Sequence, residues 1–246
     1  MNSIHLFRTL GLAEIKQIRR DPMLRWMIFL PLVMALAARG VIPLIFERLA
    51  AALPFPLMPY YPAIMGFVLA TLGPSLVGYV IGFLLLDQRD EGSLTALLVT
   101  PLSLARYLAY RLMWPMLAGV VVTAIILPLS GLVQLNGVGL VLVGVSAAAN
   151  APLYALTLAT FANNKVQGMA LMKASSVITL PPLIAFFLPQ TWQWPFALFP
   201  TYWQARFFWS VTGDGSWGGL FLVASIAYQI LLLLLLFRLF YRRLHQ

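Results

Sequence analysis

Residues 62–86 read PAIMGFVLATLGPSLVGYVIGFLLL and carry no charged side chain. A helix needs about 20 consecutive apolar residues to cross a bilayer, so this run is long enough to span one. It is followed at once by DQRDEGSLTALLVTPLSLARY, residues 87–107, which holds three of the seven acidic residues of the chain. This succession predicts a membrane helix that ends in a charged, Gly-containing loop in the aqueous phase.

The composition of the whole chain indicates the same class. About 61% of the residues are hydrophobic, 9% are charged and the mean hydropathy is +0.90, whereas soluble domains have roughly 25% charged residues. We therefore expect an all-α integral membrane protein that forms a single transmembrane domain over residues 1–246. Its six predicted transmembrane helices are the apolar runs 24–46, 62–86, 107–129, 137–161, 175–188 and 218–240.

The basic residues divide unequally between the two sides of the membrane. With six spans, most of the sixteen Lys and Arg residues fall on one side, and the other side keeps only Arg39, Arg48 and Arg206. Because cytoplasmic loops carry the excess of basic residues, both termini and the loop 87–105 are predicted to be cytoplasmic. Topology and contact with lipid headgroups then explain the formal net charge of +9, so no nucleic acid partner is expected.

Two segments outside the spans have patterns of their own. Residues 3–20 place apolar side chains near one helical face and basic ones mostly elsewhere, which predicts a helix lying in the membrane interface, as a passive anchor or as a lever for a cytoplasmic partner. Residues 189–217 are dense in aromatic side chains, which gather at membrane interfaces. Pro195 and Pro200 interrupt them, so we favour short, half-inserted outer helices before the last span over a simple aromatic belt.

No motif for catalysis is present in the sequence. The chain lacks the Gly-rich loop with Lys-Ser or Lys-Thr that cradles phosphates, has no cysteine, and carries its histidines, His5 and His245, at opposite ends. We predict no catalytic, cofactor-binding or metal-binding residue. The apolar runs also hold no Asp or Glu, which ion-coupled carriers place at membrane depth, and Arg39 can snorkel from the end of its span. Energy for transport is therefore expected from another subunit.

Residues 90–103, DEGSLTALLVTPLS, resemble the signature of ABC-2 type transporter permeases. In that family the loop between the second and third spans carries an acidic residue, Gly, Ser or Thr, and then an apolar helix ending in Thr-Pro-Leu-Ser. Residues 197–202, ALFPTY, look like a diverged form of the family's Asn-Pro-Leu-Thr-Tyr stretch without the Asn. The remainder agrees with the family in architecture, and the compact size is most similar to small bacterial drug-export permeases, including those for fluoroquinolones.

The resemblance implies a partner and a contact surface. Family permeases form dimers, identical or mixed, and each half sits on a separate ATPase subunit that binds ATP and Mg²⁺. The loop helix is the coupling helix, whose leucines would fill a groove on the ATPase while charges at the rim set the register. Gly92 allows the chain to turn before Ser93, which suits a helix N-cap. By position, the contact residues would be Glu91, Gly92, Ser93, Leu94, Leu97 and Leu98.

The expected function is that of a permease subunit of an ABC exporter in a prokaryotic plasma membrane. In the family, the substrate route lies at the dimer interface and is lined by the second and fifth spans. Uncharged walls there favour an amphiphilic or apolar drug or lipid-like substrate. The alternatives are a non-transporting membrane scaffold or assembly protein, and a channel or facilitator that needs no ATP. For the loop helix, the alternative is an amphipathic segment that lies on lipid headgroups.

Overall fold

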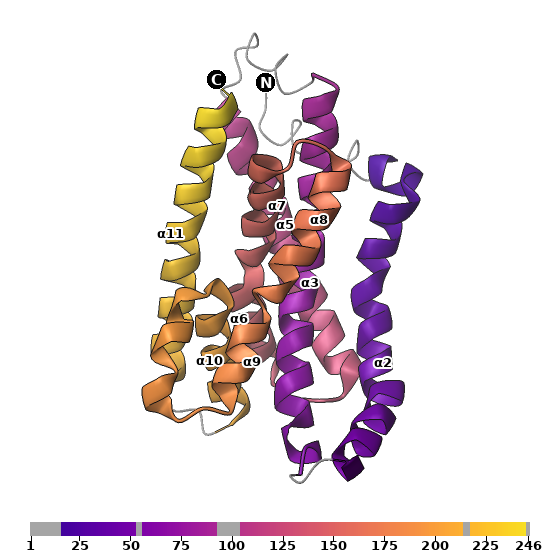
Figure 1. The fold of residues 1–246 in the computed structure, drawn as a ribbon, viewed down its shortest axis with the longest axis vertical. Coiled ribbons are helices and arrows are strands. Elements are labelled where there is room, and N and C mark those ends of the chain that lie inside the picture. The colour runs from indigo at the N-terminus through magenta and orange to yellow at the C-terminus, as the bar shows by residue number, and fades with distance from the viewer. Residues whose placement is uncertain (1–15, 53–55, 93–103, 214–216, 245–246) are drawn as a thin grey trace.

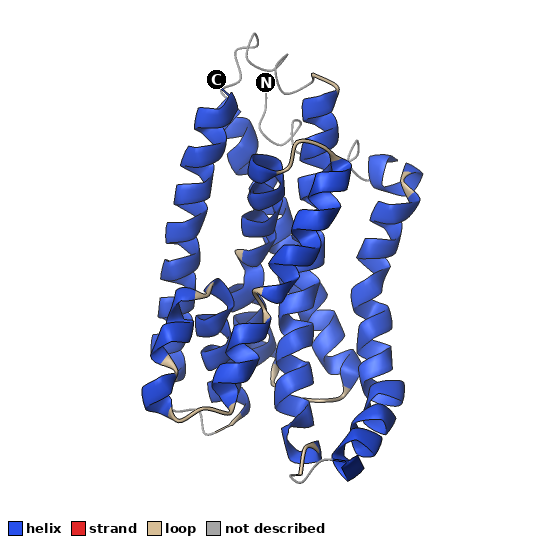
Figure 2. Ribbon diagram, viewed as in Figure 1, coloured by secondary structure: helices blue, strands red, loops and turns tan. Residues whose placement is uncertain are grey.

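The computed structural model of this protein describes residues 16–52, 56–92, 104–213 and 217–244. These residues form helices joined by short loops, with no β-strand among them (Figure 2), which confirms the all-α class. In chain order the elements are α2 (Pro22–Ala52), η1 (Met58–Tyr60), α3 (Tyr61–Asp90), α5 (Leu104–Ser130), α6 (Gly137–Ala148), α7 (Asn150–Phe161), α8 (Lys165–Val177), α9 (Leu180–Phe186), η2 (Gln190–Trp192), η3 (Trp194–Leu198), α10 (Pro200–Thr212) and α11 (Gly218–Leu244).

Six helical stretches are long and apolar enough to cross a membrane, which confirms the predicted number of spans. Figure 1 shows them as one bundle whose helices run along its long dimension. The fifth differs most from its predicted range of 175–188, because its helix begins at Lys165. The six stretches are Pro22–Ala52, Met58–Asp90, Arg111–Ser130, Gly137–Phe161, Lys165–Phe186 and Gly218–Arg243.

The fourth and fifth spans are each broken into two helices, and proline accounts for both breaks. Proline has no N–H to donate to the carbonyl four residues before it, and its ring crowds that carbonyl. Pro152 therefore leaves the carbonyl of Ala148 without a helical partner, and α6 ends at Ala148. In the same way Pro181 frees the carbonyl of Val177, where α8 ends.

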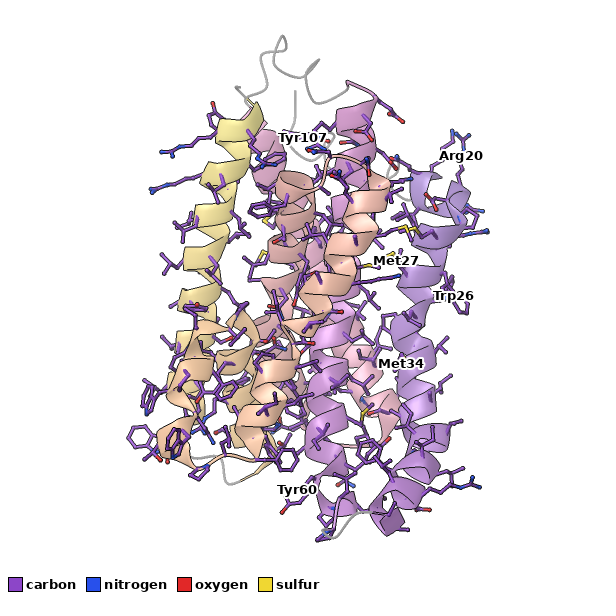
Figure 3. The ribbon with its side chains drawn as sticks, viewed as in Figure 1. Arg20, Trp26, Met27, Met34, Tyr60 and Tyr107 are labelled. Carbon is purple, nitrogen blue, oxygen red and sulfur yellow. The ribbon has the colours of Figure 1, made fainter. Side chains whose placement is uncertain are left out.

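The second and fourth spans form the inner layer of the bundle. Their most apolar stretches are 83% and 72% buried, whereas those of the other four spans are between 11% and 33% buried. Small residues let α3 and α7 approach closely: a Cβ built at Gly78 would lie 2.3 Å from the carbonyl oxygen of Ala151. On α2, Met27 points into the bundle and Trp26 points away from it (Figure 3), as expected for a helix that faces lipid.

The two ends of the bundle differ in charge. Figure 1 shows the beginning of α2 and the end of α11 at the same end, as an even number of crossings requires. Asp21, Asp87 and Lys165 meet there, and we name this the charged end. Arg39 lies toward the opposite end, where its Nε is 4.0 Å from a Cβ built on Gly131 in the turn after α5. Which end is cytoplasmic stays a prediction.

Three short helices, η2, η3 and α10, fill the segment between α9 and α11, toward the end opposite the charged end (Figure 1). α10 packs against α11, α6 and α3, and the indole of Trp209 donates to the carbonyl of Ala63 at 3.1 Å. Short helices are therefore present before the last span, while their role as a cap stays a prediction. The interfacial helix predicted at 3–20 falls mostly outside the described residues.

Candidate functional site

A lysine that bridges two carboxylates holds the charged end together. Lys165 Nζ lies 3.1 Å from Asp21 Oδ2 and 3.0 Å from Asp87 Oδ2. Asp21 precedes α2, Asp87 lies in the last turn of α3 and Lys165 begins α8, so one ammonium group joins three spans. Because all three side chains are partly exposed, each pair contributes only about 0.2–1 kcal/mol. The bridge therefore defines the arrangement of these helices more than it stabilises them.

Two arginines close the carboxyl end of α7. The last carbonyls of a helix lack partners within it and carry the negative end of the helix dipole. Arg89 donates from Nη1 to Ala159 O at 3.1 Å and from Nη2 to Ala162 O at 2.6 Å, and Arg243 donates to Thr160 O. Since Arg89 lies in the last turn of α3 and Arg243 in α11, the end of α7 is tied to both helices.

A polar cluster joins the two helices that flank residues 93–103. Gln88 Oε1 accepts hydrogen bonds from Tyr107 Oη at 3.1 Å and from Arg111 Nη1 at 2.5 Å. Arg111 also donates to Tyr107 Oη and is buried. Gln88 lies at the end of α3, and the other two residues lie one turn apart in α5, at the charged end (Figure 3 labels Tyr107). The two ends of the intervening segment are thus held together.

Of the six residues predicted to contact an ATPase, the structure describes Glu91 and Gly92. Both are exposed beyond the end of α3, where Glu91 N donates to Asp87 O at 2.9 Å and Gly92 N donates to Arg89 O at 3.0 Å. Gly92 has φ +70°, a conformation that glycine adopts at little cost. The other four predicted contact residues lie outside the described residues, so the coupling-helix assignment stays a prediction. They are Ser93, Leu94, Leu97 and Leu98.

Ionisation of the Asp21 carboxyl group makes the stability of the charged end depend on pH. Burial opposes its ionisation, but hydrogen bonds from the Lys165 ammonium and from the backbone amides of Leu24 and Met23 outweigh burial and lower the pKa of Asp21. A carboxyl group whose pKa is lowered by folding stabilises the fold above its ordinary pKa. This stabilisation is lost as the pH falls through the lowered value.

We therefore expect Asp21→Asn, which keeps an N-cap but removes the charge, to lower the free energy of unfolding by about 1 kcal/mol at pH 7. As the pH falls through the lowered pKa of Asp21, the wild-type carboxyl takes up a proton, so at acid pH the two proteins should differ by less than at pH 7. Thermal unfolding in detergent at both pH values measures this difference. Glu47→Gln, at an exposed carboxylate elsewhere on α2, serves as the control. An Asp21→Asn effect of equal size at both pH values would contradict the assignment.

A cavity of about 220 Å³ lies between α3, α7 and α8. One face of α3 forms most of its wall, at helical spacing from Phe67 to Tyr79. The rings of Tyr79 and Tyr154 meet with their centroids 4.8 Å apart, and Tyr79 Oη and Ser175 Oγ are hydrogen-bonded at 2.8 Å. The cavity is lined by Phe67, Val68, Thr71, Leu72, Ser75, Leu76, Tyr79, Tyr154, Met172, Lys173, Ser176 and Thr179.

The second and fifth spans supply most of this lining, and the wall carries a charged side chain, Lys173. The expectation of uncharged walls concerned a dimer interface and stays a prediction. The sequence interpretation placed Lys173 in a loop before a span from residue 175, whereas it lies within α8 and lines the cavity. At 1.5 Å per residue, Lys173 is about 12 Å along the helix from Lys165. Lys173 therefore lies more than two helical turns inside the fifth candidate span, Lys165–Phe186. Charged side chains within spans are rare and commonly functional.

Buried polar side chains connect the cavity to α10. Thr71 Oγ1, in the cavity wall, accepts from Gln204 Nε2 at 3.2 Å, and Gln204 Oε1 accepts from Asn150 Nδ2 at 2.6 Å. All three residues are buried. Sequence reasoning missed this chain of contacts, although amide side chains within apolar runs are a signal of interhelical hydrogen bonds.

Six apolar helices, a cavity beside the inner layer and charges gathered at one end define a multi-pass membrane protein. Within the described residues, no three His, Cys, Asp or Glu side chains come together as metal ligands would. The comparisons with known proteins identify the family within this class.

The chain belongs to the Rv2686c-like family of fluoroquinolones export permease proteins, whose family model matches residues 14–237. Two relatives from Mycobacterium tuberculosis are each 31% identical to it over 232 residues, which cover 94% of this chain and 92% of each relative. They are the fluoroquinolones export permease proteins Rv2686c, of strain ATCC 25618 / H37Rv, and MT2760, of strain CDC 1551 / Oshkosh. The predicted resemblance to bacterial drug-export permeases is confirmed: the chain is a transport permease of a prokaryotic plasma membrane.

Proposed function

We propose that this chain is the permease subunit of an ATP-binding-cassette exporter of the ABC-2 type. It forms the translocation path for an amphiphilic or apolar, drug-like substrate. A separate ATPase subunit binds ATP and Mg²⁺, and a second permease subunit, identical or different, completes the path. Because both relatives are named as fluoroquinolones export permeases, fluoroquinolones are the first substrates to test.

The observation that carries this proposal is the set of contacts between the two helices on either side of the predicted coupling segment, residues 93–103. In the described part of the chain, α3 ends at Asp90 before these residues, and α5, which carries Tyr107 and Arg111, begins at Leu104 after them. Gln88 bonds to both of these α5 residues. A force applied to the segment would therefore reach α3, and the same helix forms most of the cavity wall. Packed elements of this kind move as units in switching transitions.

In the proposed cycle, closure of the paired ATPase subunits pushes the segment and turns the cavity from inward-facing to outward-facing. The two bonds from Arg89 to the end of α7 make α3 and α7 move together. The Lys165 bridge is more exposed, and such ion pairs are weak. It is therefore the place where α2 and α8 can separate from the inner layer during the cycle.

The exposed face of α8 supports a second permease subunit beside the cavity. Val166, Met169 and Val177 are large apolar side chains exposed on this helix, whose residue Lys173 lines the cavity. Pockets for drug-sized ligands measure roughly 300–1,000 Å³, more than the 220 Å³ found in one chain. A partner opposite α8 would enlarge the enclosed space.

Affinity purification from the native host tests the ATPase partnership. The wild-type chain is expected to retain an ATPase with a phosphate-binding Gly-rich loop, and Leu94→Asp or Leu97→Asp to lose it, because a charge cannot fill an apolar groove. Leu198→Asp is the matched control, since Leu198 is 76% exposed and lies away from the charged end. Retention of the ATPase by the folded Leu94 and Leu97 variants would refute the docking surface, and its absence from the wild type would favour a channel or scaffold.

A further inference from the structure

The three spans that line the cavity each contain a point where proline weakens the helix. The fourth span breaks at Ala149 and the fifth after Val177. The second span stays one helix, α3, but has Pro74 in its interior. Since Pro74 has no N–H to donate to the carbonyl of Ala70, α3 lacks one backbone hydrogen bond there.

Contacts between these spans place the three weak points at one level of the bundle. Gly78 of α3 packs against Ala151 of α7, and Tyr79 is hydrogen-bonded to Ser175 of α8. One helical turn from these contacts, away from the charged end, each span reaches its weak point. Figure 1 shows α7 and α8 on the side of the charged end and α6, α9 and α10 on the other side. We name the residues reached the hinge level: Pro74 and Ser75 in α3, Ala147 and Ala148 at the end of α6, and Ile178 and Thr179 between α8 and α9.

Hydroxyl groups beside Pro74 weaken α3 further. Thr71 Oγ1 donates to Phe67 O at 3.0 Å, and Ser75 Oγ donates to Thr71 O at 2.6 Å. Such bonds to the carbonyl four residues back slightly destabilise a helix and often bend it. The part of α3 that lines the cavity extends from Phe67 to Tyr79, on both sides of Pro74. A bend at this point would therefore change the shape of the cavity.

Helix α10 bonds to all three spans near the hinge level. Gln204 donates to Thr71 of α3 at 3.2 Å and accepts from Asn150, the first residue of α7, at 2.6 Å. Thr201 Oγ1 donates to Ile178 O at 3.4 Å, a carbonyl that the proline four residues later leaves without a helical partner. Gln204 and Thr201 are fully buried, so water does not compete for these bonds. α10 thus connects the three weak points.

We propose that the second, fourth and fifth spans bend together at the hinge level, and that α10 holds their present arrangement through Gln204 and Thr201. The half of the bundle toward the charged end then moves against the other half, and the cavity between them changes shape. A bend of about 20° over the roughly 24 Å from Pro74 to Asp90 would move the end of α3 by about 8 Å. The inference deepens the proposed function and rests on it for the force that bends the bundle.

Site-resolved hydrogen exchange of the full chain in phosphatidylcholine nanodiscs tests the hinge level without an ATPase. In the wild type, the amide of Ser75 should exchange roughly tenfold faster or more than those of Leu69 and Leu84, which are also buried in α3. Pro74→Ala restores the missing donor and is expected to slow exchange at Ser75 about tenfold. Pro43→Ala, inside α2, is the matched control and should leave that rate unchanged.

Loss of a contact from α10 tests whether the three spans are coupled. Gln204→Leu should speed exchange about tenfold at Ser75, at Leu153 and at Thr179 alike, although the last of these lies on a span that Gln204 does not bond to. Thr212→Val is the control, because its hydroxyl bonds to carbonyls of α10 itself. Pro74→Ala strengthens a helix, so it tests the proposal even if Gln204→Leu does not fold.

Three outcomes would overturn the inference. Faster exchange in Gln204→Leu that spares Thr179 would show that the weak points open independently. Equal exchange at Ser75 in the wild type and in Pro74→Ala would remove the hinge from α3. In vesicles with the ATPase, Pro74→Ala should bind the ATPase normally and export about tenfold more slowly, so export at the wild-type rate would separate the bend from transport. Absence of ATP-dependent export from the wild type would count against the proposed function alone, because the exchange rates are measured without an ATPase.

Discussion

Gly78→Val is expected to prevent the bundle from assembling. A Cβ at this position would lie 2.3 Å from Ala151 O and 2.8 Å from Ala151 Cα, both backbone atoms that cannot rotate away. α3 and α7 would have to separate along the whole inner layer. The loss of folding free energy should therefore be about twice the 1–3 kcal/mol that is usual for overpacking. With a total stability of roughly 5–15 kcal/mol, most of the protein should then be unfolded or aggregated.

Size-exclusion chromatography and thermal unfolding in detergent measure this effect. The matched control is Gly40→Val on α2, where a Cβ would meet nothing within 4 Å. The control should be recovered in wild-type yield with a similar melting temperature. If the two variants behave alike, the close packing of α3 on α7 is not what holds the inner layer together.

Leu97→Asp and Glu91→Lys are expected to abolish ATP-dependent export while leaving membrane insertion intact. An interface hot spot contributes about 2 kcal/mol or more, and a buried aspartate adds a desolvation cost, so occupancy of the ATPase should fall by far more than tenfold. Glu91→Lys reverses a charge at the predicted rim, which slows association and favours wrong registers. Glu91 is exposed beyond α3, so its replacement should not disturb the fold.

Export is followed as fluoroquinolone accumulation in inverted vesicles from cells that express the variant with its ATPase. Immunodetection in the membrane fraction and a wild-type elution profile establish insertion and folding. Glu47→Lys repeats the charge reversal on an exposed glutamate at the far end of α2 and should export normally. Full export by both folded coupling-segment variants would show that energy reaches the bundle by another route.

The six-helix class could be predicted from the sequence because the hydropathy of the apolar runs is enough to locate the membrane-spanning helices. The charge-free run 62–86 lies within the helix that ends at Asp90, and the predicted range 137–161 coincides with α6 and α7 together. The predicted fifth span, 175–188, is too short at its beginning. Lys165, Gln167 and Lys173 lower the local hydropathy of α8, so the pattern of this helix is typical of a loop.

Side-chain contacts between distant helices could not be predicted in this way. The Lys165 bridge joins residues 144 positions apart in the chain, and no local pattern relates them. The cavity depends on the same kind of information, because its lining comes from three helices whose relative rotation is set by packing. The motif at residues 90–103 predicts the family, and the comparisons confirm this prediction. The contacts of Leu94 and Leu97 lie outside the described residues and rest on the motif alone.

Transport in proteoliposomes that contain this chain and its ATPase tests the central claim most directly. With the ATPase side outward, the proposed function predicts that a fluoroquinolone accumulates inside when ATP and Mg²⁺ are added. It predicts none with a non-hydrolysable ATP analogue, and no effect of collapsing the proton gradient. Accumulation without ATP, or accumulation that an ionophore abolishes while ATP is present, would contradict it and assign the chain to gradient-driven or passive transport.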